Sequence, residues 1–149
     1  MSKPDLVPYE TTLAVRDACL CLHAQRAARA LARRFDAALR PFGLTSGQFS
    51  LLMALNRPEP PGIGAVAGVL AMDRTTLTAA LKPLVRDGLV AVAPDRADRR
   101  SRRLSLTAAG RGRLAAAVPV WRQEHAALDA VLADADRLRA DLRALSAQS

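Results

Sequence analysis

The sequence predicts a mainly α fold (α+β), a winged helix-turn-helix with long N- and C-terminal helices, formed by residues 1–149 as a single domain. Three observations support this prediction. Both ends of the chain carry apolar residues at helical spacing. Two short amphipathic helices joined by a tight turn lie between them. Two short β-type runs then flank the arginine-rich stretch "DRADRRSRRLS".

Residues 12–42 are predicted to form one long helix, with Leu31, Phe35 and Leu39 on its apolar stripe. Cys19 and Cys21 would project about 200° apart on this helix, so we expect them not to bridge each other. The sequence shows no secretory signal and no apolar run long enough to span a bilayer. A reduced, cytoplasmic protein is therefore expected.

Residues 45–106 are predicted to form the winged helix-turn-helix lobe. Thr45 and Gln48 fit a capping box at the start of its first helix, and the prolines of "RPEPPG" must end that helix. The apolar residues of this helix that we expect in the core are Phe49, Leu52, Met53 and Leu55.

The helix-turn-helix is predicted over residues 63–88. Asp73 is a good N-cap for its second helix, Gly88 is expected to end it, and Pro83 is expected to kink it. The buried side of the second helix is predicted to consist of Leu77, Ala80, Leu81, Leu84 and Val85. The side chains predicted to face outward are Arg74, Thr75, Thr76, Thr78 and Lys82.

Residues 89–106 are predicted to form a wing, a hairpin of "LVAVA" and "RLSLT" with the arginine run at its tip. Residues 73–113 carry ten basic side chains against four aspartates, and so hold six of the eight net positive charges of the chain. Such a localised basic surface favours nucleic acid over other polyanions. Aromatic residues make up only 3% of the chain, which argues against single-strand or RNA binding by base stacking.

Residues 107–146 are predicted to be helical, with a bend at Pro119. The apolar residues of a coiled-coil-type seam in this stretch are Leu128, Val131, Ala135, Leu138, Leu142 and Leu145. This seam needs a partner, which the first long helix or a second subunit could supply. A two-fold dimer is the preferred interpretation.

In this order of elements, and in the segments "GLTSGQFSLLMAL", "MDRTTLTAALKPLVRDGLV" and "DRADRRSRRLSLTAAG", the chain resembles the MarR family of bacterial transcription regulators. The last segment contains the family's Asp-x-Arg pair, Asp98 and Arg100, followed by Leu-x-Leu-Thr-x-x-Gly. Ala71 stands where the turn of this family usually has glycine.

The resemblance implies a homodimeric regulator on a palindromic double-stranded DNA operator, with residues 12–42 and 107–146 as dimerisation helices. A repressor is expected, although the location of the operator decides the sign. Arg100 would enter the minor groove, with Asp98 orienting its guanidinium through a charge-assisted bond. The full set of expected DNA-binding residues is Arg74, Thr75, Thr76, Thr78, Lys82, Asp98, Arg99, Arg100, Arg102 and Arg103. Lys82, Arg99, Arg102 and Arg103 are assigned to phosphates within this set.

The resemblance also implies release from DNA by a small, aromatic or phenolic effector. Candidate ligand-binding residues are His23, Arg26, Trp121 and His125, although core packing for Trp121 and His125 and a surface position for Arg26 are the simpler interpretations. Cys21 lies where the organic-hydroperoxide sensors of this family carry a reactive thiol. The tyrosines that surround that thiol are absent here, so we favour a small buried side chain.

The inventory of residues argues against an enzyme. No nucleophilic constellation, phosphate loop or metal-ligand cluster is apparent, and neither a metal nor a cofactor is expected. The alternative from another class is an architectural protein that binds duplex DNA by shape, without an operator.

Overall fold

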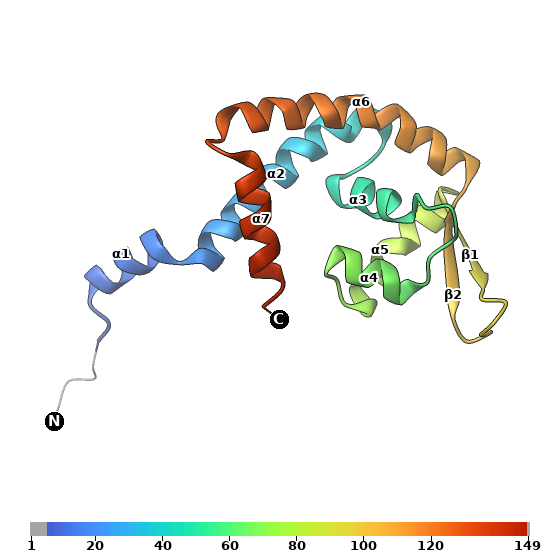
Figure 1. Ribbon diagram of the computed structural model, residues 1–149, viewed down its shortest axis with the longest axis horizontal. Coiled ribbons are helices and arrows are strands. Elements are labelled where there is room, and N and C mark those ends of the chain that lie inside the picture. The colour runs from blue at the N-terminus through green and yellow to red at the C-terminus, as the bar shows by residue number, and fades with distance from the viewer. Residues whose placement is uncertain (1–5, 149) are drawn as a thin grey trace. The chain divides into compact units, whose positions relative to one another are not determined.

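A computed structural model describes residues 6–148 and confirms the mainly α winged helix fold (Figure 1). The elements in chain order are α1 (Tyr9–Ala18), α2 (Leu20–Leu39), the 3-10 turn η1 (Arg40–Phe42), α3 (Ser46–Leu55), α4 (Ile63–Leu70), α5 (Arg74–Arg86), β1 (Val90–Pro94), β2 (Arg102–Leu106), α6 (Ala108–Val131) and α7 (Ala135–Ser146). The described residues divide into two compact units, 6–34 and 35–148, and α2 crosses the boundary. The buried apolar core lies in the second unit.

Cys19 interrupts the predicted long helix, so the expectation of one helix over residues 12–42 is wrong. Its backbone is extended (φ −70°, ψ 111°). Its N–H donates to the carbonyl of Val15 at 2.9 Å, and its Sγ accepts from the N–H of Leu22 at 3.4 Å. The sulfur therefore caps the start of α2, as N-cap oxygens do elsewhere. Because Cys19 is not helical, the helical spacing assumed for the two cysteines is also wrong; both thiols are free.

The capping box at the start of α3 is confirmed. The hydroxyl of Thr45 accepts from the N–H of Gln48 at 3.1 Å, and the Gln48 side chain accepts from the N–H of Thr45 at 3.1 Å. The proline-rich segment 57–62 then separates α3 from α4, as predicted. Prolines supply no N–H for a continuing helix, so α4 begins only after this segment.

The turn between α4 and α5 places an alanine in the left-handed region. Ala71 has φ 50° and ψ 45°, and the N–H of Met72 donates to the carbonyl of Ala67 at 2.9 Å. Glycine adopts this conformation without a Cβ clash, whereas alanine is strained in it by about 1–2 kcal/mol. The turn therefore forms despite the missing glycine.

The predicted wing is confirmed as an antiparallel hairpin, with Val90 opposite Leu106 and Pro94 opposite Arg102. A third segment joins its edge: the N–H of Leu104 donates to the carbonyl of Pro61 at 2.9 Å, and Gly62 forms a β-bridge with Arg103. The α3–α4 connection therefore supports the wing along β2.

The start of α6 is tied to the base of the wing through Thr107 and Gly110. The hydroxyl of Thr107 donates to the carbonyl of Gly88 at 2.6 Å and accepts from the N–H of Gly110 at 3.0 Å. The N–H of Thr107 donates to the carbonyl of Leu89 at 3.1 Å. A Cβ on Gly110 would lie 2.1 Å from that same carbonyl oxygen, so only glycine fits here.

α6 continues through Pro119 to Val131 as one helix, but the predicted seam to the C-terminus is broken. Leu132 is extended (φ −93°, ψ 143°), and Asp134 caps α7 by accepting from the N–H of Arg137 at 2.9 Å. Arg139 bonds Asp129 and Asp136, which joins the two helices across the break. A continuous coiled-coil seam through residues 128–145 is therefore wrong.

The core of the second unit is formed by the end of α2, by α3, α4 and α5, by the hairpin and by the first half of α6. Leu39, Leu52, Leu77, Leu84 and Leu104 are among its fully buried side chains. Two predicted core residues, Met53 and Val85, are exposed instead. Within residues 6–148, no helix combines the length and the apolar character needed to cross a membrane.

Replacing Gly110 by alanine should destabilise the fold. The new Cβ would meet the Leu89 carbonyl oxygen at 2.1 Å, and α6 would have to move away from the wing. We expect Gly110→Ala to lower the free energy of unfolding by about 2–3 kcal/mol in urea titrations.

Gly112→Ala is the matched control in the same helix, because nothing lies within 4 Å of a Cβ at that position. It should stabilise the protein by about 0.5–1 kcal/mol. Equal effects of the two substitutions would contradict the close approach at Gly110.

Candidate nucleic-acid interface and adjoining pocket

The N-terminus of α5 is organised by Asp73. Its carboxylate accepts from the backbone N–H of Thr76 at 2.8 Å and from the Thr76 hydroxyl at 2.8 Å. These two bonds, the backbone bond first, lower the pKa of Asp73. The predicted cap is confirmed, and it uses a threonine hydroxyl that we had expected only at the DNA.

The outward face of α5 consists of side chains that take no part in the core. Arg74, Thr75, Thr76, Thr78 and Lys82 are all exposed. The Arg74 side chain folds back over α4, since a Cβ on Gly64 would lie 3.0 Å from its Nη2. α5 runs past Pro83 to Arg86 as one helix, followed by Asp87 as C-cap and Gly88 in the left-handed conformation (φ 73°).

The two aspartates of the wing shape its tip. Asp95 accepts from the N–H of Ala97 at 2.9 Å. Asp98 accepts from the backbone N–H of Arg100 at 3.0 Å and from the hydroxyl of Ser101 at 3.3 Å. In the described wing, Asp98 therefore holds the backbone of Arg100, and the expected bond to the Arg100 guanidinium is not formed. The short sequence distance between the two residues favours the turn contact over a side-chain pair.

Arg103 is engaged within the protein. Its Nε and Nη2 donate to Asp95 Oδ2 at 2.9 and 2.8 Å, and its Nη1 donates to the carbonyl of Pro60 at 3.2 Å. The structure thus gives Arg103 partners within the protein that the sequence did not predict, and its contact with a DNA phosphate stays a prediction. The sequence gives Asp95 and Arg103 no obvious pairing, because only the hairpin register brings them together.

The remaining cations of the wing lie at or near its tip. Arg96, Arg99, Arg100 and Arg102 are exposed, and Arg102 Nη1 donates to the carbonyl of Arg99 at 3.1 Å. Arg96 was not among the predicted DNA-binding residues, although it belongs to the same basic run. Beside α5, the wing forms a surface whose chemistry suits phosphates and base edges.

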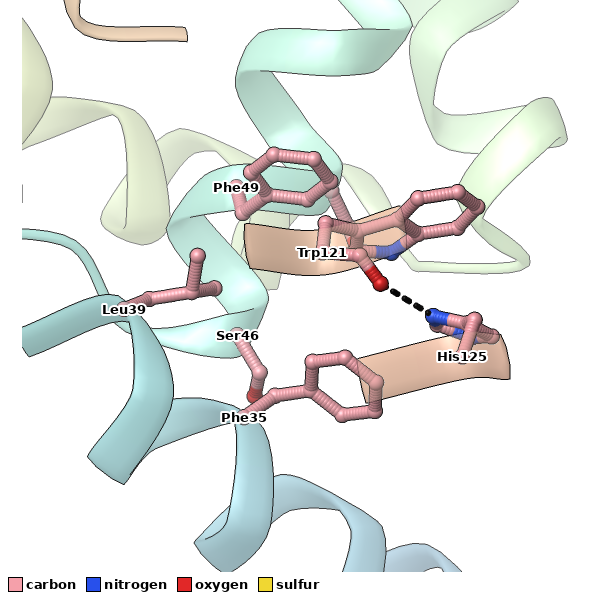
Figure 2. A pocket seen from close by; sticks show the side chains of 7 residues that line it. Phe35, Leu39, Ser46, Phe49, Trp121 and His125 are labelled. Atoms are coloured by element: carbon pink, nitrogen blue, oxygen red, sulfur yellow. Dashed lines mark hydrogen bonds between the residues drawn. The ribbon is translucent and has the colours of Figure 1, made fainter. Parts of the chain in front are cut away.

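A pocket of about 240 Å³ is lined by residues of α2, α3 and α6. Figure 2 shows three of its rings, Phe35, Phe49 and Trp121, arranged around the cavity with His125 beside them. Leu39, Ser46 and Ser50 complete its lining. The sequence predicted Trp121 and His125 but missed the other members, because they come from separate helices.

Trp121, His125 and Phe35 follow one another as a row of rings, each tilted by 34° against the next. The centroids of Trp121 and His125 are 4.1 Å apart, and those of His125 and Phe35 are 4.7 Å apart. His125 Nδ1 bonds the carbonyl of Trp121 at 3.2 Å (Figure 2). Because a carbonyl oxygen only accepts, Nδ1 carries a proton and Nε2 is left for another partner.

The other predicted ligand residues lie in the first unit. His23 Nδ1 bonds the carbonyl of Cys19 at 2.7 Å, and Arg26 is exposed on α2. Cys21 is exposed, not buried as expected, and its redox role stays a prediction. Among the described residues, no group of three histidines, cysteines or acidic residues is placed to hold a metal ion.

The α4–α5 pair and the basic hairpin define a winged helix-turn-helix protein. The sequence profile of the MarR family matches residues 44–101. The M. tuberculosis transcriptional regulator MosR, in a crystal structure with DNA, is 41% identical, with a TM-score of 0.80 and coverage of 86% of this chain and 93% of that one. The chain belongs to the MarR family.

Two further relatives are similar over different lengths. The transcriptional repressor CouR bound to a 23-mer DNA duplex is 28% identical, with a TM-score of 0.73 and coverage of 89% of this chain and 94% of that one. The transcriptional activatory protein BadR of Rhodopseudomonas palustris is 43% identical over 72 residues, which are 46% of this chain and 41% of BadR. The chain therefore matches about two fifths of BadR (41%).

The cap at Asp73 gives α5 a stability that depends on pH. The folded protein lowers the pKa of Asp73, so its contribution is present above the ordinary carboxyl pKa and is lost as the pH falls through the lowered value. We expect Asp73→Ala to lower the Tm at pH 7. The difference from wild type should shrink in increasingly acidic buffer.

Asp73→Asn is the control, because asparagine caps a helix about as well as aspartate but does not titrate. Its Tm should stay near that of wild type at pH 7. An Asp73→Ala protein as stable as wild type at pH 7 would show that the cap is dispensable.

Proposed function

We propose that this protein is a transcriptional repressor that binds a palindromic double-stranded DNA operator as a homodimer and is released by a small aromatic or phenolic ligand. In this proposal α5 lies in the major groove, and the tip of the wing enters the adjacent minor groove. Each subunit reads one half-site.

The observation that carries the proposal is the joint surface of α5 and the wing. Arg74, Thr75 and Thr78 are exposed on α5, and Arg99 and Arg100 are exposed at the wing. Arginine and threonine suit base edges and phosphates, and an arginine side chain is favoured in narrow minor grooves. The solved structures of MosR and CouR named above are complexes with DNA, which supports the same use of this surface.

Exposed leucines on α7 support the homodimer. Leu138, Leu142 and Leu145 are 41%, 45% and 49% exposed and follow one another at helical spacing. A second copy of the chain could cover this stripe about a two-fold axis. A two-fold dimer then presents its two α5 helices to half-sites related by the same symmetry.

We propose repression and not activation of transcription, although relatives differ in this respect. CouR is described as a repressor and BadR as an activatory protein. Whether transcription is repressed or activated follows from where the operator lies relative to the promoter. Repression requires that the operator and the promoter overlap.

The pocket between α3 and α6 supports the effector. Its volume of about 240 Å³ exceeds that of an apolar protein cavity of about 150 Å³ that binds benzene. Phe35, Phe49 and Trp121 offer ring faces, and His125 Nε2 offers one polar contact. A single substituted ring with a hydroxyl or carboxyl group fits this combination.

DNA recognition can be tested on the intergenic DNA beside the protein's own gene. We expect hydroxyl-radical footprinting to show protection over about two helical turns, centred on a palindrome. Arg100→Ala should weaken binding by about 1–3 kcal/mol and relax the preference at the flanks of the site.

Arg122→Ala, at an exposed position on α6 outside the joint surface, is the control and should bind as wild type does. Equal binding to any duplex, without a footprint, would favour the architectural alternative. Wild-type affinity and footprint for Arg100→Ala would remove the wing tip from recognition.

The effector site can be tested through Trp121, the only tryptophan of the chain. We expect benzoate or 4-hydroxybenzoate to change its fluorescence saturably and to release DNA over the same concentration range. Cyclohexanecarboxylate, which lacks the aromatic ring, should bind more weakly. His125→Phe keeps a ring but removes Nε2, and should weaken the binding of 4-hydroxybenzoate by about 0.5–1.5 kcal/mol.

Gln123→Ala, an exposed neighbour on α6, is the control for the substitution. If a compound releases DNA without changing the fluorescence of Trp121, the effector binds outside this pocket. If none of these compounds alters either fluorescence or DNA binding, the proposal of a small aromatic ligand in this pocket is wrong, while the proposal of DNA binding stands.

A further inference from the structure

Arg103 is the cation of the wing that is most completely engaged by the protein itself. Its guanidinium makes two bonds to Asp95 Oδ2, at 2.9 and 2.8 Å, and one to the carbonyl of Pro60 at 3.2 Å. The side chain of Asp95 is only 14% exposed, whereas that of Arg103 is 47% exposed. The pair is internally neutral, so it adds little to the positive potential of the wing.

Asp95 connects this pair to the tip of the wing. Its second oxygen, Oδ1, accepts from the N–H of Ala97 at 2.9 Å, and its own N–H donates to the carbonyl of Ser101 at 3.0 Å. The Ala97 N–H and then the Arg103 guanidinium lower the pKa of Asp95, which keeps the carboxylate ionised. One carboxylate therefore binds both the turn that carries the tip arginines and the guanidinium from β2.

Arg103 also connects the wing to the helix-turn-helix. Pro60 and Pro61 belong to the segment that follows α3, and Gly62 is the N-cap of α4. In this segment Pro61 accepts from the N–H of Leu104, and Gly62 forms a β-bridge with Arg103. Two consecutive prolines cannot donate to a neighbouring strand, so the donors of this junction come from β2 and from the Arg103 side chain.

We propose that Arg103 is a positioning residue for DNA binding: with Asp95 and the carbonyl of Pro60, it fixes the wing relative to α4 and α5, and it does not neutralise a phosphate. The inference rests on the proposed DNA-binding function. In this role, Arg103 keeps Arg99 and Arg100 at the minor groove, because it holds the hairpin whose turn carries them next to the reading helix α5.

The two roles of Arg103 predict opposite effects of removing Asp95. If Arg103 contacts a phosphate, loss of the nearby carboxylate frees a cation and binding becomes tighter. If Arg103 positions the wing, Asp95→Ala weakens binding although it makes the protein more positive. The sign of the Asp95→Ala effect therefore separates the roles.

The experiment is a double-mutant cycle on the operator identified by footprinting, with Arg103→Ala, Asp95→Ala and the double variant as full-length proteins. We expect each single substitution to weaken binding about tenfold, and the double variant to be no weaker than either single, because both break one unit. Hydroxyl-radical protection should disappear at the flanks of the operator and persist at its centre, where α5 lies.

Arg103→Lys adds a variant that keeps the charge. Lysine serves as a phosphate contact but cannot reproduce the fork that bonds Asp95 and Pro60 together. We expect it to bind as weakly as Arg103→Ala. Arg102→Ala is the matched control, because Arg102 is the neighbour of Arg103 on β2 and, among the described residues, its side chain bonds only the Arg99 carbonyl. It should weaken protection over the whole operator and should not remove it selectively at the flanks.

Thermal unfolding separates positioning from a loss of the fold. The Tm of each variant should remain close to that of wild type, since the pair lies at the surface. Should a variant unfold, Arg103→Gln and Asp95→Asn replace the alanine variants in the same cycle.

Tighter binding by Asp95→Ala, or wild-type affinity for Arg103→Lys, would overturn the inference while the proposed function stands. Failure of the wild-type protein to bind any duplex would overturn the proposed function and the inference with it. Loss at both flanks and centre in Arg103→Ala, with an intact fold, would also overturn the positioning role.

Discussion

The close approach of α6 to the backbone of Leu89 is the constraint on which the lobe depends. The Leu89 carbonyl accepts from the N–H of Thr107, and Gly110 packs directly against it. The Thr107 hydroxyl closes the same junction by donating to the carbonyl of Gly88. The end of α5, both strands of the wing and the start of α6 therefore meet at one point, where backbone contacts constrain their relative directions.

Local sequence signals predicted the helices that begin at a capping residue. Thr45 and Asp73 cap their helices as predicted, because capping needs only neighbouring residues. The breaks at Cys19 and at Leu132 were not predicted, since neither carries glycine or proline and the apolar spacing continues across both. Hydrophobic periodicity reports which residues share a face, and a single extended residue leaves that pattern almost unchanged.

The site was predictable as a set of residue types but not as a set of partners. The basic run and the outward face of α5 follow from charge and spacing. The pairing of Arg103 with Asp95 depends on hairpin register, and its bond to Pro60 depends on a contact between residues far apart in sequence. Phe35, Phe49 and Trp121 likewise meet from three helices, so only the fold brings their rings to one pocket.

α3 lines the pocket and also packs against elements that carry the proposed DNA surface. α3 lines the pocket with Phe49 while Leu51 and Leu52 are buried in the core, and α3 packs against α4, β2 and α6. Phe49 and Trp121 lie with centroids 6.1 Å apart and nearly parallel, and both line the pocket, so the effector proposed above would contact α3 and α6 together. α3 packs against α4, and α6 is joined to the base of the wing through Thr107 and Gly110, so a shift of either helix would alter the position of α5 or of the wing. In the proposed mechanism, operator binding depends on that relative position.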